Sequence, residues 1–348
     1  MTVAQNPTTT AAVVGCGAIS SEHLAAIAAN PHVVLVGLSD TDPGRLEVAA
    51  AAASCQGYGD YRQMIAEQRP DVVHICTPHH LHSEMAIHCL ERNINVLLEK
   101  PLATTVDDAA AVVDAADRSS AQVGVCFQNR YNATSRRLRE IVDSREFGTV
   151  NSAVASVIWS RDAKYYQRRE WRGRWATAGG GVLINQAIHT LDLLQWYLGD
   201  VHDVRGSAST LLLPEPIEVE DTASVVLTHG DGRRSIFFAT NTHTDNEPVT
   251  IELRTQKAIL RLHTDLAVIH PDGSEEILVE QERRSGEKAY WGASHGRLID
   301  DFYRHVRSGR KFWIDAREAR KTLTTITSVY DQSSLRGRSP VVRSLSLP

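Results

Sequence analysis

Short apolar runs alternate with helical segments through the first third of the chain. The runs are rich in valine, isoleucine and leucine, which is typical of buried strands. Predicted strands cover 11–15, 33–39, 71–76, 95–98 and 121–127, and predicted helices cover 20–29, 80–92 and 106–118. A further helix is expected to begin at Pro43, after the capping residue Asp42. This alternation predicts a parallel sheet with helices on both faces.

The pattern changes after about residue 148, where strands with partial apolar alternation follow one another. They are predicted at 150–160, 204–213, 222–228, 233–241, 249–254, 258–263, 266–270 and 276–279. Asp231-Gly232 and Asp272-Gly273 are typical of tight hairpins, so the second sheet should be mostly antiparallel. Helices at 293–307 and 315–332 close the chain.

Two domains are therefore expected, covering 1–127 and 128–348, which suits a chain of 348 residues. The second is an α+β domain with a large open sheet. Helix 315–332 is a candidate to pack back on the first domain. One face of such a sheet needs covering, so we expect a homodimer or homotetramer formed through it.

Composition excludes several classes of partner. The formal net charge is −5, which gives no basic surface for nucleic acid or anionic membrane. The five cysteines show no C-x-x-C spacing and are expected to be small core residues in a reducing compartment. The first ten residues carry no positive charge, and the next apolar stretch is too short for a signal or a membrane span. A cytoplasmic protein is predicted.

The first strand runs into a glycine turn, Gly15-Cys16-Gly17-Ala18-Ile19, that opens a helix. This turn predicts a Rossmann-type dinucleotide site, although Ser20 replaces the third glycine and a plain tight turn remains the alternative. Asp40 ends the second strand, where an acid accepts hydrogen bonds from the adenosine ribose and repels a 2′-phosphate. NAD is therefore favoured, while the nearby Arg45 keeps NADP open.

Glu99-Lys100-Pro101 follows a later strand, at the edge of the sheet where such folds bind ligands. A lysine held there can stabilise a developing alkoxide, and the alternative is a surface lysine beside a turn. Glu99 is expected to orient Lys100 or the nicotinamide end of the cofactor, or only to flank the site.

A glycine run, Gly179-Gly180-Gly181, precedes a predicted helix in the second domain. Asn185, His189 and Asp192 lie at i, i+4 and i+7, which predicts one helical stripe facing the site. An imidazole titrates near neutral pH and suits the role of base. The alternative is the solvated side of an amphipathic helix.

Two further segments offer polar side chains. The stretch from Tyr165 to Trp175 is dense in aromatics and arginines, including Trp171 and Arg172, and is expected to be a substrate loop or else a structural one. Gln128, Asn129 and Arg130 follow the last parallel strand and are candidate rim residues, and His295 is a weaker substrate candidate.

His79, His80, His82 and His88 also cluster, but no carboxylate or thiolate completes a metal-ligand spacing, so no metal is expected. His79 and His80 are interpreted as residues at a helix start.

Four segments in order resemble the Gfo/Idh/MocA family (glucose–fructose oxidoreductase, inositol dehydrogenase and rhizopine-catabolism oxidoreductases). They are Gly15-Cys16-Gly17-Ala18-Ile19, Cys76-Thr77-Pro78-His79-His80-Leu81-His82, Glu99-Lys100-Pro101, and the segment from Gly179 to Asp192. The resemblance implies that Lys100 touches the reacting hydroxyl and that His189 is the acid/base. Asn185 stands where many members have aspartate, and His82 is placed near the cofactor.

The chain is thus predicted to be an NAD-dependent oxidoreductase acting on a ring hydroxyl or ketone of a sugar, glycoside or cyclitol. A nucleotide-sugar or sugar-acid dehydrogenase is the first alternative, and a non-catalytic dinucleotide-binding sensor the second. The expected catalytic residues are Lys100, His189 and Asn185. The expected cofactor residues are Gly15, Cys16, Gly17, Ala18, Ile19, Asp40, Arg45, Thr77, Pro78, His82, Glu99, Lys100 and Gln128. The expected substrate residues are Lys100, Arg130, Tyr165, Trp171, Arg172, Asn185, His189 and Asp192.

Overall fold

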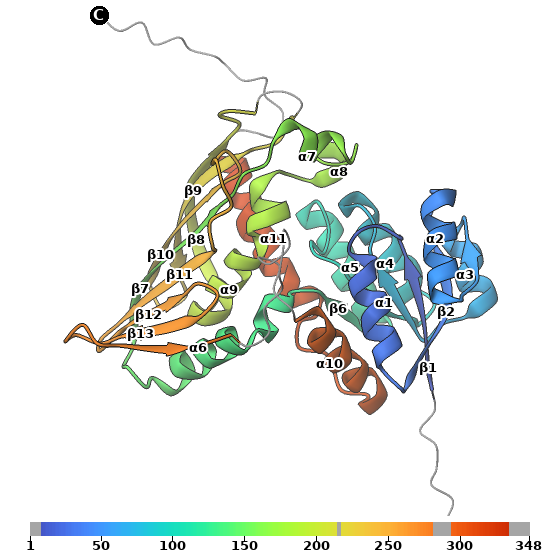
Figure 1. Cartoon of the computed structure of the whole chain (residues 1–348), viewed down its shortest axis with the longest axis horizontal. Helices are drawn as coiled ribbons and strands as arrows, with labels where there is room; N and C mark the ends of the chain where they lie inside the picture. The colour runs from blue at the N-terminus through green and yellow to red at the C-terminus, as the bar shows by residue number, and fades with distance from the viewer. Residues whose placement is uncertain (1–7, 214–216, 281–293, 334–348) are drawn as a thin grey trace, which may run out of the picture.

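The computed structural model describes residues 8–213, 217–280 and 294–333, which form two sheets with helices between and around them (Figure 1). The first sheet is parallel, in the order β3-β2-β1-β4-β5-β6. Its strands are β1 (Thr9–Val14), β2 (Val33–Ser39), β3 (Gly57–Tyr58), β4 (Val72–Ile75), β5 (Asn95–Leu98) and β6 (Val123–Val125). Its helices are α1 (Ser20–Ala29), α2 (Pro43–Ala53), α3 (Tyr61–Gln68), α4 (His82–Leu90) and α5 (Val106–Arg118). The predicted α/β alternation is confirmed.

The order of this sheet decides where a ligand can bind. Strand β1 lies between β2 and β4, so the chain crosses to opposite sides of β1 in its two halves. Open sheets bind ligands in the crevice outside the carboxyl ends of the strands at this reversal. The glycine turn after β1 and the Cys76-Thr77-Pro78 segment after β4 both lie there.

The second sheet has the order β14-β13-β12-β11-β7-β10-β9-β8, and only β7 and β10 run parallel within it. Its strands are β7 (Val150–Ile158), β8 (Val201–Ser209), β9 (Thr222–His229), β10 (Arg234–Thr240), β11 (Thr250–Thr255), β12 (Ile259–Leu262), β13 (Leu266–Ile269) and β14 (Glu275–Leu278). The two Asp-Gly pairs form the β9–β10 and β13–β14 turns, with Gly232 and Gly273 at positive φ. A large, mostly antiparallel sheet is therefore confirmed.

Among the residues that the structure describes, helices cover one face of the second sheet and leave the other open (Figure 1). The covering helices include α6 (Ala133–Ser144), α9 (Ile188–Leu198) and α11 (Ala316–Gln332). Alternate residues such as Ala153, Ala155 and Val157 are buried beneath them, whereas Val154 between them is exposed.

The two terminal helices join the sheets. Helix α11 packs against β8 and α9 of the second unit and also against α5 of the first. Helix α10 (His295–Ser308) lies against α1 and β5, so it belongs with the first sheet in space although it follows the second in sequence (Figure 1). Within the described ranges, no helix combines the length and hydropathy needed to cross a bilayer.

Candidate active site

The glycine turn after β1 is a tight loop that only glycine can begin. Gly15 has φ +92°, and a Cβ there would come within 2.7 Å of the Cys76 carbonyl oxygen. A Cβ on Gly17 would meet nothing within 4 Å, so the loop faces open space. Ser20, which replaces the third glycine, donates its hydroxyl to the Gly17 carbonyl at 2.7 Å. The turn thus presents the α1 N-terminus to a cavity, as anion binding requires.

Asp40 lies at the end of β2, where its side chain is 7% exposed. Its carboxylate accepts hydrogen bonds from the backbone amides of Cys16 (2.7 Å) and Asp42 (2.8 Å). Arg45 also donates to it, at 3.1 Å. Asp40, which was expected to select the cofactor, is therefore hydrogen-bonded both to the glycine turn and to Arg45.

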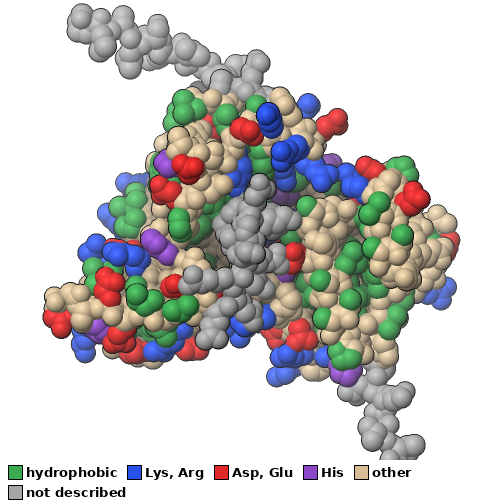
Figure 2. Space-filling view, viewed as in Figure 1, with side chains coloured by type: hydrophobic (Ala, Val, Ile, Leu, Met, Phe, Trp, Pro, Cys, Tyr) green, Lys and Arg blue, Asp and Glu red, His purple; other side chains and the backbone are tan. Residues whose placement is uncertain are grey.

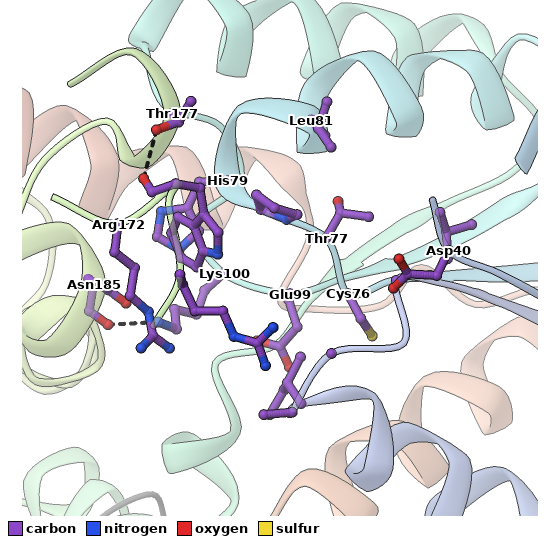
Figure 3. Close-up of a pocket in the computed structure, with 18 of the residues that line it drawn as sticks. Asp40, Cys76, Thr77, His79, Leu81, Glu99, Lys100, Arg172, Thr177 and Asn185 are labelled. Carbon is purple, nitrogen blue, oxygen red and sulfur yellow. Dashed lines mark hydrogen bonds between the residues drawn. The ribbon is translucent and has the colours of Figure 1, made fainter. Parts of the chain in front are cut away.

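Lys100 follows β5 and reaches across to the second unit. Its Nζ donates to the backbone carbonyl of Asn185 at 2.7 Å (Figure 3). Burial lowers the pKa of Lys100 to about 8, and the charge of Arg172 adds to that effect while Glu99 opposes it. A buried lysine whose pKa is lowered in this way, in a cavity, is a candidate functional group.

The helix that carries Asn185 and His189 begins with a π-helical turn, η3 (Leu183–Ala187), before α9. Such turns are frequent at functional sites. Both side chains line the cavity. Burial and the Lys100 charge lower the pKa of His189 well below its ordinary value. Its Nδ1 has no hydrogen-bond partner among the described residues, so the neutral ring lines the cavity with a nitrogen that can still form a hydrogen bond.

Each glycine before this helix packs against a different neighbour. A Cβ on Gly179 would meet the Thr104 side chain at 2.7 Å, and one on Gly181 would meet the Glu220 carbonyl oxygen at 1.8 Å. Glu220 accepts hydrogen bonds from the amides of Gly181 (2.7 Å) and Leu183 (2.9 Å). Burial raises its pKa to about 7. Sequence reasoning missed Glu220, because no local pattern marks a buried acid that caps a distant helix.

The aromatic and arginine-rich segment forms a wall of the same cavity. It contains two short helices, α7 (Ala163–Gln167) and α8 (Trp175–Ala178). The Arg172 guanidinium lies 4.2 Å from the centre of the Tyr165 ring. Lys and Arg side chains gather on the surface over this part of the molecule (Figure 2). His79, which was assigned only to a helix start, also lines the cavity, and its ring centre lies 4.6 Å from that of Trp171 with the ring planes tilted by 56°.

One cavity of about 1360 Å³ takes in most of the predicted residues. Asp40 lies at one end, and Lys100, Asn185 and Arg172 lie together at the other (Figure 3). A typical small-molecule pocket holds about 300–1,000 Å³, so there is room for a dinucleotide and a second ligand. The expected residues that line it are Gly15, Gly17, Ala18, Ile19, Asp40, Arg45, Thr77, Pro78, Glu99, Lys100, Gln128, Tyr165, Trp171, Arg172, Asn185 and His189.

Arg130 and Asp192, which were expected at the substrate, do not line the cavity. Both are buried, and Arg130 donates to the Asp192 carboxylate at 2.6 and 2.7 Å. Arg130 also pairs with Glu318 of α11 at 3.0 Å. Asn185 and His189 of the predicted stripe line the cavity, whereas Asp192, one turn further on, is paired with Arg130 in the interior.

Cys16 and His82 do not line the cavity either. The Cys16 amide donates a hydrogen bond to Asp40, and the Cys16 thiol points toward the Ser39 carbonyl. The His82 ring nitrogens lie 2.7 and 2.9 Å from the carbonyl oxygens of Pro101 and Thr77. His82 therefore supports two lining segments without facing the ligand space.

Comparison with known proteins identifies the family and the fold. Residues 9–127 match the model of an oxidoreductase family with an NAD-binding Rossmann fold, and residues 135–261 match the GFO/IDH/MocA C-terminal domain. The chain is 27% identical to D-apiose dehydrogenase of Paraburkholderia graminis, over 96% of this chain and 90% of that protein. It is 25% identical to levoglucosan dehydrogenase of Pseudarthrobacter phenanthrenivorans, over 72% and 70% of the two chains.

Solved structures share the whole architecture. The WlbA dehydrogenase from Bordetella pertussis, in complex with NADH and UDP-GlcNAcA, superposes with a TM-score of 0.82 at 28% identity, covering 94% of this chain and 97% of that one. Levoglucosan dehydrogenase in complex with NADH and levoglucosan gives a TM-score of 0.83 at 21% identity, over 94% and 97%, which shows the shared fold. The chain belongs to the Gfo/Idh/MocA family of NAD-binding oxidoreductases.

Proposed function

We propose that this dehydrogenase oxidises a ring hydroxyl of a sugar, glycoside or cyclitol, or reduces the matching ketone, with Lys100 and His189 as its catalytic residues. The observation that carries the proposal is the meeting of these two side chains in one cavity that begins at the glycine turn. Lys100 comes from the first unit and His189 from the second, so neither unit has the site alone.

The cofactor end of the cavity fits NAD. The open space at Gly17 and the α1 N-terminus would receive the pyrophosphate, and Asp40 would face the adenosine ribose. Thr77, Pro78, Glu99 and Gln128 would line the way to the nicotinamide. Bound NAD supplies the hydride acceptor for the oxidation. We propose NAD over NADP because the Asp40 carboxylate repels a 2′-phosphate.

Alcohol oxidation also needs a base and a stabilised alkoxide. The neutral His189 ring can take the hydroxyl proton, and protonated Lys100 can stabilise the oxygen as charge develops. Because the pKa of Lys100 is about 8, loss of its proton should lower catalytic efficiency above that pH. If catalytic efficiency instead rises through this pH range, Lys100 acts as the base.

The test is Lys100→Ala, followed by absorbance of reduced nicotinamide in a screen of monosaccharides, glycosides and inositols. We expect loss of turnover with cofactor affinity within a few-fold of the native protein. The matched control is Lys311→Ala, an exposed lysine outside the cavity, which should keep full activity. Activity of Lys100→Ala within about tenfold of native, roughly 1.4 kcal/mol of barrier, would contradict the assignment. A non-catalytic sensor would bind NAD and turn over none of the substrates.

A second candidate substrate class is an anionic sugar, such as a nucleotide sugar or sugar acid. Five arginines between residues 161 and 174 line the cavity, against one lining acid of that segment, Glu170; its other acid, Asp162, lies outside the lining. The WlbA relative was crystallised with UDP-GlcNAcA, which is consistent with this option. Arg172→Met should raise KM for an anionic substrate much more than for a neutral sugar, and equal effects on both would contradict an anion site.

We also propose that the molecule is a cytoplasmic homo-oligomer whose subunits meet through the open face of the second sheet, and that the domains divide near residue 127. Val226, Ile236 and Val154 lie side by side on β9, β10 and β7 and are 37%, 54% and 46% exposed. An apolar row on an uncovered sheet is typical of a subunit interface.

A further inference from the structure

Five buried polar side chains form a connected group behind the Lys100 end of the cavity. They are His23 of α1, His74 of β4, Glu99 after β5, and His295 and Tyr303 of α10, each at most 6% exposed. Glu99 and His295 line the cavity, whereas the other three lie outside its lining. The proposed chemistry uses none of those three.

The contacts run in one line from α10 to the cavity. The Tyr303 hydroxyl lies 2.7 Å from His74 Nε2, and His74 Nδ1 lies 2.7 Å from His23 Nδ1. His23 Nε2 lies 3.1 Å from Glu99 Oε1. His295 Nε2 approaches the same carboxylate oxygen at 3.3 Å.

With both rings neutral, the chemistry of these groups fixes the direction of each hydrogen bond. An ionised Glu99 can only accept, so His23 Nε2 carries a proton and donates it. In a neutral ring His23 Nδ1 then accepts, so His74 Nδ1 must donate. His74 Nε2 is left as an acceptor for the Tyr303 hydroxyl. One arrangement of neutral rings therefore satisfies every contact, and all of its donors point toward Glu99.

The charge states agree with this arrangement. Burial alone would raise the pKa of Glu99, but the hydrogen bond with His23 and the approach of His295 to the same carboxylate hold it well below its ordinary value. Burial, together with the nearby His23, lowers the pKa of His74 well below its ordinary value, so that ring is neutral.

We propose that Tyr303, His74 and His23 form a hydrogen-bond relay that positions Glu99 as a fixed negative charge beside Lys100, and that these positioning residues thereby set the upper pH limit of the site. The inference rests on the proposed role of Lys100. Without a donor at residue 23, the pKa of buried Glu99 would rise, and the neighbouring negative charge that favours the cationic form of Lys100 would weaken.

Other charged groups face the same two residues and must be held constant. Lys100 also feels Arg172, and its charge in turn acts on His79, His82 and His189. Glu99 also faces His295 and the thiols of Cys76 and Cys126, whose pKa values burial raises well above the ordinary value. The test variants leave all of these residues in place.

The first test needs no change to the protein. NMR of the histidine ring nitrogens near neutral pH should show both rings neutral and in opposite tautomers, with His23 protonated at Nε2 and His74 at Nδ1. Tyr303→Phe, which removes one oxygen, assigns the His74 signals. A charged His23, or a His23 protonated at Nδ1, would overturn the relay. So would stoichiometric zinc in the purified protein, because His23 Nε2 cannot both bind a metal and donate to Glu99.

The second test is the pH profile of catalytic efficiency. His23→Leu removes the donor and should move the basic limb to lower pH by about one unit. His23→Gln keeps a donor for Glu99 and should stay near the native profile, and Tyr303→Phe should give a smaller shift in the same direction. Unmoved basic limbs in both His23→Leu and Tyr303→Phe would overturn the proposal. Activity retained in Lys100→Ala would contradict the proposed function while leaving the tautomer result intact, so the two failures are distinguishable.

Discussion

At the scale of single residues, position 185 acts in two separate ways. Its backbone carbonyl accepts the hydrogen bond from Lys100, a contact that any residue could make. Its side chain lines the cavity on the same helix as His189. The amide of Asn185 can hydrogen-bond like the aspartate of many family members, but it brings no charge to the neighbouring base.

Asn185→Asp should therefore move the acidic limb of the oxidation profile to higher pH by about one unit. The reason is that an anion favours the protonated imidazole and raises the pKa of His189, which in the native protein is well below its ordinary value. A base must be neutral to act, so activity would be lost at a higher pH as the solution is acidified. The measurement is catalytic efficiency against pH, with Asn185→Ala as the control that should leave the limb in place. An acidic limb in the Asp variant that stays put, or moves to lower pH, would mean that residue 185 does not neighbour the base.

Asp40 and Arg45 form the second residue-scale pair, and they have opposite preferences for a 2′-phosphate. Asp40→Ser should lower the ratio of NAD to NADP efficiency by at least about tenfold, roughly 1.4 kcal/mol, because repulsion is lost and Arg45 is freed to bind the phosphate. The double variant Asp40→Ser/Arg45→Ala should lose the gain in NADP use. If the native protein uses NADP and NAD with equal catalytic efficiency, the attraction of Arg45 for the 2′-phosphate already outweighs the repulsion by Asp40.

At the scale of elements, buried carboxylates hold the helix that carries Asn185 and His189 at its first turn and near its middle. Glu220 caps the first turn, and Asp192 of α9 is bound by Arg130, which also contacts Glu318 of α11. Arg130 lies a few residues after β6, just past the proposed division of the domains, so this buried ion pair fixes the helix that carries His189 to the start of the second unit. The pair thus has a structural role at the junction of the two units.

Arg130→Met should destabilise the protein by about 3–5 kcal/mol, because Asp192 would remain buried without its partner. The double variant Arg130→Met/Asp192→Leu removes the orphaned charge and should recover most of the stability. Chemical denaturation of the three proteins measures both values. An Arg130→Met variant as stable as the native protein would show that Asp192 finds another partner. A rise in KM for one substrate without destabilisation would indicate that Arg130 contacts the substrate.

At the scale of the whole molecule, two features depend on surfaces far apart in sequence. The cavity lies between the two units, and the open face of the second sheet carries the apolar row Val226, Ile236 and Val154 on three neighbouring strands. The helices α9 and α11 occupy the other face, so a second copy of the chain is the occupant we propose for the open one.

Ile236→Lys should reduce the molar mass measured by light scattering from that of a dimer or tetramer toward that of one 38.4 kDa chain. A charge at the centre of a buried apolar row would have to be desolvated, which disfavours association. The matched control is Val34→Lys, since Val34 is a strand residue of the first sheet with 49% exposure. A native protein that is already a monomer, or an unchanged mass in the Ile236 variant, would contradict this interface.

The sequence by itself determined the two-sheet architecture, the glycine turn and the place of Lys100 after its strand, because these depend on local periodicity and on spacing within a few residues. Strand and helix patterns such as 33–39 and 106–118 agree with the structure residue for residue. Tertiary structure alone decided which polar side chains meet. Arg130 and Asp192 look like site residues in the sequence, yet they neutralise each other in the interior, and Glu220, His23 and His74 show no local pattern at all. A buried charge or imidazole is fixed by partners from distant elements, so its role follows from packing.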